Sequence, residues 1–369
     1  MDERIFPRKL GEPVPEWERN HRLPINGRVG PTCSDDGTIF RRNRVYMDVC
    51  DQPFCSRQWI AAAVLVAIVG AFVGLYFSVL PFYLGRIDPK HLSGVFLLVS
   101  WSMLSMLGFG YAAFYFGRDE FFSLTRRTLR FHRLQKKLFI VRRRRFFAKT
   151  GEGDIFWEVP WSDETIFCVH AGKKNGVRNY QIVGYILDGA GNVDRAFAIG
   201  KDWEGSEGLE NLLAQWNYYC SYMNEGPEAT PEPMLYLAEE ENFRESFLHC
   251  MYEFGHSAGL VFRVVLMPAF LVLTGIRVLA LATCRPPIWP AEVERLCVIS
   301  ENDPHTQPSG ETPVGWAATV VAKHHGKYPS FPQREVAAWS GPGSAENARL
   351  WSAELSPLNY AVLYPAEVV

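Results

Sequence analysis

Two long uncharged runs constrain the fold of this chain more than any other feature of its sequence. Trp59 to Leu84 holds 26 residues without a charge, and Leu92 to Phe116 holds 25. A helix of about 20 apolar residues spans the hydrocarbon core of a bilayer. The alternative, a buried helical hairpin of a globular protein, does not require uncharged runs of this length. The sequence therefore predicts a transmembrane hairpin over residues 59–116, joined by the seven-residue loop GRIDPKH.

Positive charge gathers on both flanks of this hairpin, whereas its loop carries only Arg86 and Lys90 against Asp88. Lysine and arginine near the ends of spans favour the cytoplasmic side, so both flanks and the N-terminus are expected in the cytoplasm. All eight cysteines lie outside the two runs at irregular spacings, which is typical of free thiols in a reducing compartment. The flanking basic residues are Arg41, Arg42, Arg44, Arg57, Arg118, Arg126, Arg127, Arg130, Arg133, Lys136 and Lys137.

Residues 1–58 are expected to form a polar cytoplasmic arm. Within it, DDGTIFRRNRVYMDVCD has two short β-rich runs on either side of residues 42–44, which predicts a β-hairpin. Cys50 and Cys55 are close in sequence, but no second pair of cysteines or histidines stands near enough to complete a zinc site. We therefore expect ordinary thiols here, and neither a metal nor another cofactor.

Residues 121–225 alternate with a period of two, which is typical of β-strands. RTLRFHRL, KLFIVR, IFWEVPW, TIFCVH, YQIVGYIL and NVDRAFAIG are separated by turn signals and predict about six short antiparallel strands. A helix with apolar residues at helical spacing follows and ends before Gly226. Strands capped by one helix resemble the pleckstrin-homology-like architecture, with another small α+β domain as the alternative. The predicted fold class is α+β, a transmembrane hairpin plus a cytoplasmic antiparallel β module with a C-terminal helix.

The β-rich module holds the candidate binding residues. Four consecutive arginines follow the second run closely, and a basic residue near an anionic membrane surface contributes about 1 kcal/mol of binding. The plainer interpretation is that they serve the positive-inside bias. Three tryptophans are the candidate contacts for a partner, although core packing is expected for at least two of them. A net charge of −2 and a pI of about 6.5 argue against nucleic acid. The candidates are Arg142, Arg143, Arg144, Arg145, Trp157, Trp161 and Trp203.

The stretch GHSAG, residues 255–259, has the G-x-S-x-G spacing of a nucleophile elbow at Ser257. Such an elbow needs a buried strand before the serine and a parallel sheet that supplies an acid and a histidine. Here an acidic amphipathic helix precedes the serine and an apolar helix follows it. We therefore predict no catalytic residues and no enzyme, and the small residues are interpreted as a break between helices. The acid and base that a hydrolase would need could come only from Asp303, His305, His324 or His325, in proline-rich sequence.

Residues 235–300 are expected to form amphipathic or membrane-associated helices, among which Leu260 to Ala282 is ambiguous. Arg263 and Arg277 each cost about 2.5–3.5 kcal/mol at the centre of a span, which roughly cancels the contribution of the apolar residues. One interpretation is a third crossing. The favoured one is an in-plane or re-entrant helix whose arginines reach the headgroups, because a third crossing would export the C-terminal tail.

Residues 301–369 are interpreted as a C-terminal tail. Ahead of it, RPPIWPAEVERL predicts a proline break followed by a short helix. His324 and His325 are adjacent and project in different directions on a helix, so they do not predict a metal site. Gly70 and Gly74 have G-x-x-x-G spacing, which would allow a homo-oligomer through the first run.

Several segments are similar to one family when taken together. They are IFRRNRVYMDVCD, the hairpin, RFHRLQKKLFIV, EVPW, YILDGAGNVDRAFAIG, WNYYCSYMNEGP and RPPIWPAEVE, within residues 20–300. They resemble a family of Gram-negative inner-membrane proteins often encoded beside type VI secretion spike and effector genes. The resemblance implies a multi-pass protein of the bacterial inner membrane with an immunity or accessory role towards a toxic effector. It carries over no catalytic residue.

Three functional hypotheses follow. The first is a membrane-anchored binding protein of an effector and immunity system, whose partners are membrane lipids and a secreted effector or secretion component. The second is a module that senses anionic lipid or membrane stress through its basic cluster. The third is a serine hydrolase that uses GHSAG. The uncharged spans and the β-rich module favour the first hypothesis.

Overall fold

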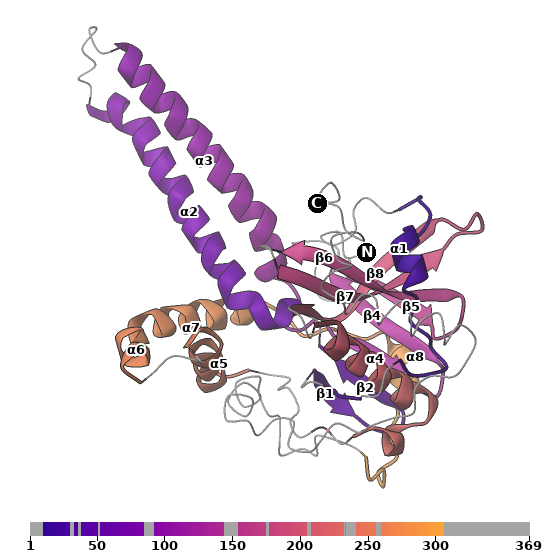
Figure 1. The fold of residues 1–369 in the computed structure, drawn as a ribbon. Helices are drawn as coiled ribbons and strands as arrows, with labels where there is room; N and C mark the ends of the chain where they lie inside the picture. Colours follow the sequence, from indigo (N-terminus) through magenta and orange to yellow (C-terminus); the bar gives the residue numbers. More distant parts are fainter. Residues whose placement is uncertain are drawn as a thin grey trace.

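A long helical hairpin stands out from a body built of strands and shorter helices (Figure 1). The sheets of this body are antiparallel, so the described part of the chain is α+β, as predicted. The residues that the computed structural model describes are 10–29, 33–35, 38–50, 52–84, 92–143, 154–174, 177–204, 208–231, 233, 241–255 and 260–305.

The hairpin consists of α2, Gln52–Leu84, and α3, Leu92–Glu120. Both helices are long and apolar enough to cross a membrane, and they coincide with the two uncharged runs. Most of their large apolar side chains are exposed, Phe72 and Trp101 among them. Helices that pack in the core of a soluble protein bury such side chains, so this surface is typical of helices that contact lipid.

Gly70 and Gly74 allow α2 to lie close against α3. A Cβ at Gly74 would lie 2.8 Å from the Ser102 carbonyl oxygen and 2.9 Å from the Met106 nitrogen, and a Cβ at Gly70 would lie 3.0 Å from the Phe109 ring. Small residues permit this close approach of two helix backbones. The G-x-x-x-G face is therefore used inside the hairpin.

The hairpin is inserted between two neighbouring strands of one sheet. This five-stranded antiparallel sheet follows chain order, and α2 and α3 connect β2 to β3. Because Val49 at the end of β2 pairs with Leu129 at the start of β3, both helices are connected to the same end of the sheet. The strands are β1, Ile39–Arg42; β2, Tyr46–Val49; β3, Leu129–His132; β4, Lys137–Arg143; and β5, Asp154–Pro160.

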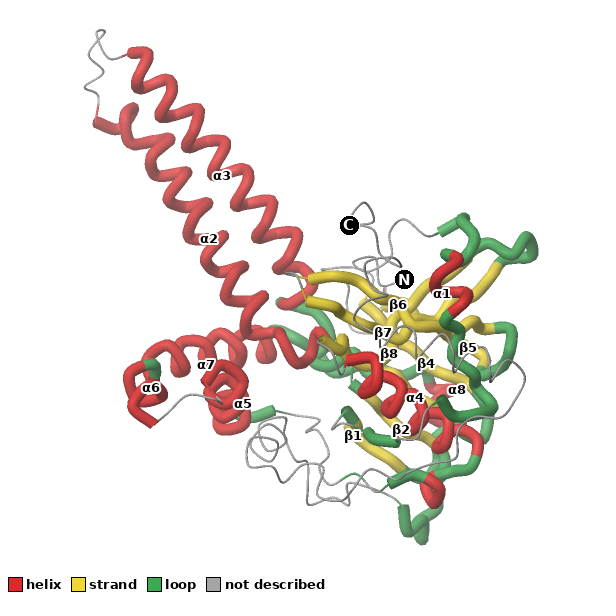
Figure 2. The backbone as a smooth tube through the Cα atoms, in the orientation of Figure 1, coloured by secondary structure: helices red, strands yellow, loops and turns green. Residues whose placement is uncertain are grey.

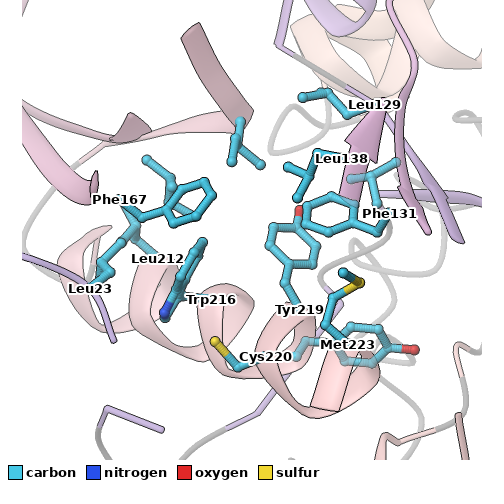
Figure 3. Packing of buried hydrophobic residues seen from close by; sticks show 14 of the residues in the cluster. Leu23, Leu129, Phe131, Leu138, Phe167, Leu212, Trp216, Tyr219, Cys220 and Met223 are labelled. Atoms are coloured by element: carbon cyan, nitrogen blue, oxygen red, sulfur yellow. The ribbon is translucent and has the colours of Figure 1, made fainter. Parts of the chain in front are cut away.

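A three-stranded sheet and helix α4, Gly208–Asn224, complete the body. Side chains of α4 contact both sheets: Trp216 packs on Phe167, and Tyr219 packs on Phe131 (Figure 3). The six strands that the period-two pattern predicts between residues 121 and 225, and the closing helix that the helical spacing predicts, are present. The strands of the second sheet are β6, Thr165–Lys174; β7, Val177–Leu187; and β8, Val193–Glu204.

The N-terminal segment belongs to the body, which corrects the expectation of a separate arm over residues 1–58. The predicted β-hairpin is present as β1 and β2, but β2 also pairs along its whole length with β3. Upstream, α1, Glu16–Asn20, packs on β6, where Glu18 Oε1 lies 2.7 Å from His170 Nδ1. The polar composition of the segment did not reveal these pairings, because their partners lie beyond the transmembrane-like runs.

The remaining helices lie at the base of the hairpin and on the sheet. The short α6, Leu260–Val265, precedes α7, Met267–Ala282, and α5 packs against α7 (Figure 2). The apolar helix expected over residues 260–282 is therefore broken at Leu266. The other elements are α5, Phe243–Gly255; the 3₁₀ helix η2, Pro227–Ala229; and α8, Ala291–Leu296, which is the short helix predicted after the proline break.

The close approach of α2 and α3 generates a first prediction. Gly74→Ala places a methyl group against the backbone of α3, so we expect the hairpin to lose about 1–3 kcal/mol of stability, the usual effect of overpacking. Thermal unfolding of the detergent-solubilised chain measures the loss. Gly108→Ala is the matched control, since a Cβ at Gly108 of α3 meets no atom within 4 Å. Equal melting temperatures for the two variants would contradict the packing described here.

Candidate functional site at the base of the hairpin

A buried ion pair joins the start of α2 to the end of α3. Arg57 Nε lies 3.6 Å from Glu120 Oε2, and the two side chains are 1% and 0% exposed. Arg57 also donates hydrogen bonds to the Leu124 carbonyl oxygen at 2.9 Å and to Cys284 Sγ at 3.1 Å. This guanidinium therefore connects both ends of the hairpin to the segment that follows α7.

A second buried ion pair joins α7 to the residues just before α5, and its arginine also reaches the hairpin. Arg277 Nε and Nη2 donate to the two carboxylate oxygens of Glu241 at 2.6 and 2.7 Å, a bidentate arrangement. Arg277 Nη1 donates to Gln58 Oε1 of α2 at 2.6 Å. The prediction that Arg277 reaches lipid headgroups is therefore wrong. Its side chain is 0% exposed, because Glu241 and Gln58 satisfy its charge inside the protein.

Helix α5 adds polar partners to this second pair. Ser246 Oγ donates to Glu241 Oε1 at 2.8 Å, and Gln58 Nε2 lies 3.2 Å from His249 Nε2. Burial disfavours the ionised form of Glu241, but the charge and hydrogen bonds of Arg277 outweigh burial and lower the pKa of this carboxyl to about 2. We call the following residues the hairpin-base cluster: Arg57, Gln58, Glu120, Glu241, His249 and Arg277.

The chemistry of the cluster is that of a structural junction. Its charged groups are paired with one another inside the protein, and such pairs fix the relative positions of the elements that carry them. Among the residues that the structure describes, no group of three histidine, cysteine, aspartate or glutamate side chains is placed to hold a metal ion. The arrangement can therefore hold α2, α3, α5 and α7 together.

Helix α7 has its polar residues inside and its apolar residues outside. Thr274 and Arg277 are buried, together with Phe270 and Ala280. A surface helix of a soluble protein shows the opposite pattern, so the exposed side fits an apolar environment. The exposed residues of the described parts of α6 and α7 are Val261, Phe262, Val264, Val265, Pro268, Ala269, Leu271, Val272, Gly275, Leu279 and Ala282.

The chain returns to the five-stranded sheet after α7. Arg285 forms a parallel backbone bridge with Leu124, just after α3. Further along, Trp289 packs in a cluster with Phe139 of β4, and its ring lies 4.3 Å from the Arg130 guanidinium of β3. This face of β4 is opposite to the one that α4 covers, because neighbouring residues of a strand point to opposite faces. Residues 283–305 therefore run beside the sheet, from Arg285 at its hairpin end to Asp303 at the turn between β1 and β2.

The three tryptophans predicted to contact a partner lie in the core. Trp157, Trp161 and Trp203 are 7%, 4% and 8% exposed and belong to the main hydrophobic cluster. Trp203 Nε1 donates to Gln215 Oε1 of α4 at 3.1 Å. The expectation of a tryptophan contact surface is corrected to the alternative of core packing, because the space between the sheets and α4 requires large side chains.

The arginine cluster begins close to the hairpin. β4 runs back towards the hairpin end of the sheet through its pairing with β3, and Arg142 and Arg143 are its last residues. The side chain of Arg142 is buried and donates to the carbonyl oxygen of the preceding residue at 3.1 Å, so it does not lie at the surface as a lipid contact would require. Arg144 and Arg145 lie outside the described residues.

The remaining candidates divide into two groups. Asp303 and His305 lie near the turn of the N-terminal β-hairpin, where an Asp303 carboxylate oxygen accepts the Arg44 backbone N–H at 2.8 Å, so Asp303 closes a turn contact. His305 Nε2 lies 3.3 Å from Glu228 Oε1. The candidates that lie outside the described residues are Ser257 of GHSAG, His324 and His325.

Sequence reasoning missed most of the hairpin-base cluster. Arg277 inside an apolar run was a signal that a buried carboxylate was needed. Glu241 is one of three consecutive glutamates, and nothing in the sequence distinguishes it from its neighbours. Gln58 and Glu120 lie close to the uncharged runs, where only lysine and arginine were interpreted, as markers of orientation.

The bidentate pair gives a prediction about stability. Arg277→Met leaves the Glu241 carboxylate buried without its main partner, so we expect a loss of about 3–5 kcal/mol. Adding Glu241→Leu should recover most of that loss, because the second change removes the unpaired charge. Thermal unfolding in detergent measures both effects. The control is Arg195→Met, which removes a half-exposed arginine paired with Asp194 and should cost at most about 1 kcal/mol. A loss of stability in Arg277→Met as small as that in Arg195→Met would contradict the pairing.

The lowered pKa of Glu241 gives a prediction about pH. Its folded-state pKa of about 2 lies below the ordinary value of 4.5. The ionised pair therefore contributes stability above pH 4.5, and the contribution is lost as the pH falls from 4.5 towards 2. We expect the difference in melting temperature between the wild type and Glu241→Gln to be constant from pH 7 to 5 and to shrink below pH 4.5. A difference that shrinks already between pH 7 and 5 would exclude this assignment.

Comparison with known proteins places the chain in a family. A family model described as "Family of unknown function (DUF6708)" matches residues 107–301, from the second half of α3 to just beyond α8, which is more than half of the chain. No curated protein and no solved structure matches. The family description names neither a secretion system nor a membrane, so the link to type VI secretion stays a prediction. The matched segment contains Glu120, Glu241, His249 and Arg277 of the hairpin-base cluster, and this chain belongs to the DUF6708 family.

Proposed function

We propose that this chain is a membrane-anchored binding protein, in which α2 and α3 span the membrane and hold the β-rich body at its surface. The observation that carries the proposal is the exposed apolar surface of the hairpin, to which Phe72, Phe96 and Trp101 contribute. An apolar surface that follows two helices of this length marks contact with lipid or with another protein. The length and the uncharged sequence of both helices favour lipid.

The junction between the hairpin and the body supports an anchor with a defined orientation. Both helices are connected to adjacent strands of one sheet, and the Arg57–Glu120 pair joins them where they meet the body. A flexible linker would leave the body free to tumble, whereas this junction restricts it. The basic flanks favour a cytoplasmic body and N-terminus, and the resemblance favours the bacterial inner membrane as the location.

For the body we propose a pleckstrin-homology-like fold, which usually serves as a binding module. The support is its order of elements: a five-stranded meander, a three-stranded sheet and the closing helix α4. The transmembrane hairpin would then be an insertion between two strands of that fold. The partner that we propose is a secreted effector or a component of a secretion system, and its only support is the resemblance of the sequence.

An anionic-lipid sensor is the second candidate, and one observation favours it. The last residues of β4, Arg142 and Arg143, lie at the end of the sheet to which the hairpin is connected. If the hairpin spans a membrane, this basic end faces the headgroups, where each arginine adds about 1 kcal/mol of attraction. The buried side chain of Arg142 weighs against a direct contact by that residue.

Purification from native membranes tests the two candidates. We expect the tagged full chain to stay in the membrane after an alkaline carbonate wash and, in mild detergent, to retain a protein partner in a fixed ratio that mass spectrometry identifies. The triple variant Arg143→Gln, Arg144→Gln, Arg145→Gln should retain the same partner. Release into the carbonate wash would refute the anchor. Retention of anionic lipid alone, lost in the triple variant, would refute the protein-binding function in favour of the sensor.

A further inference from the structure

We propose that α6 and α7 form a second membrane contact, a helix pair that lies in the surface layer of the leaflet from which the hairpin rises. The proposal rests on the proposed function, because it requires that α2 and α3 span the same membrane. It assigns a lipid-binding surface to two helices that lie outside the two proposed membrane spans. The occupant of this surface is the bilayer itself.

The distribution of polar groups identifies the lipid-facing side. The exposed side of the described parts of α6 and α7 holds only apolar residues and glycine, with Val261 and Val265 78% and 69% exposed. The charged and polar side chains of α7, Arg277 and Thr274, are buried, and Arg263, the charged residue of α6, is half-buried. A helix with this pattern exposes apolar area to water unless an apolar phase covers it.

The path of the chain argues against a third crossing. Before α6, the side chain of His249 in α5 lies beside Gln58 at the start of α2. After α7, the Arg285 N–H donates to the Ser123 carbonyl oxygen at 3.0 Å, just beyond the end of α3. His249 before α6 and Arg285 after α7 thus both lie at the body end of the hairpin. The 16 residues of α7 span about 24 Å, which is shorter than the roughly 30 Å of a bilayer core.

The position of α7 makes its apolar side continuous with the apolar surface of the hairpin. Helix α7 extends sideways from the base of α2, with α6 at its far end (Figure 2). Arg277 binds Gln58 at the level where the uncharged run of α2 begins, one residue before Trp59. If the hairpin crosses the bilayer, this level lies near the headgroups. Interfacial helices bury their apolar face about 5–10 Å into the boundary between headgroups and acyl chains.

Depth-dependent fluorescence quenching tests the proposal on the full chain. A genetically encoded, environment-sensitive fluorescent residue replaces Val272 or Leu279 on the exposed side of α7, and the protein is reconstituted into phosphatidylcholine vesicles. Phe72 at the middle of α2 reports the hairpin, and Ala190 in an exposed turn of the body reports water. The quenchers are lipids brominated near the headgroup, lipids brominated near the chain end, and aqueous iodide.

We expect the residues on α7 to lose about half of their fluorescence to the shallow bromines, and to respond weakly to the deep bromines and to iodide. Phe72 should respond most to the deep bromines, and Ala190 only to iodide. Quenching of both α7 positions by iodide would overturn the inference, provided that Phe72 still reports a spanning hairpin. If no quencher affects either α7 position, the inference is also overturned, because protein then covers α7. Stronger quenching of α7 by the deep bromines would indicate a third crossing and would also overturn it. If Phe72 is not quenched by any brominated lipid, the proposed membrane anchor itself fails.

Discussion

The interaction on which the rest of the structure depends is the pair of buried arginine–glutamate contacts at the base of the hairpin. Arg57 with Glu120 closes the hairpin where it meets the sheet, and Arg277, paired with Glu241, attaches α7 to Gln58 at the start of α2. Removing one partner from such a pair costs more stability than the whole pair contributes when it is compared with packed apolar residues. We therefore infer that the role of the pairs is to fix the geometry of the elements that carry them. The cluster therefore couples two apolar elements, the hairpin and α7, to one folded body.

The insertion of the hairpin into the sheet adds a second constraint. Because β2 and β3 are hydrogen-bonded neighbours, the chain enters α2 and returns from α3 at the same end of the sheet. The body in turn is closed by α4, whose Trp216 and Tyr219 fill the space between the two sheets (Figure 3). A force or a tilt applied to the hairpin would be transmitted to β2 and β3 and from there to the packing around α4.

Local patterns predicted the elements well and their partners poorly. The uncharged runs predicted both hairpin helices, the period-two alternation predicted β3 to β8, and the helical spacing predicted α4, because these signals lie within single elements. The pairing of β2 with β3 and the choice of Glu241 by Arg277 depend on residues far apart in the chain, and one sequence does not contain that information. Trp157, Trp161 and Trp203 were assigned to a surface because aromatic residues suit both an interface and a core, and only packing decides between them.

The central claim is that the hairpin, α7 and the sheet form one body held by the hairpin-base cluster. Pulsed electron paramagnetic resonance on the full chain in lipid nanodiscs tests it most directly, with spin labels at Ala190 in the body and at either Phe82 on α2 or Leu271 on α7. The account predicts one narrow distance distribution for each pair in the wild type, and a broader Leu271–Ala190 distribution in Arg277→Met. Broad or multiple distances in the wild type would contradict it, since they would show that the hairpin or α7 moves independently of the body.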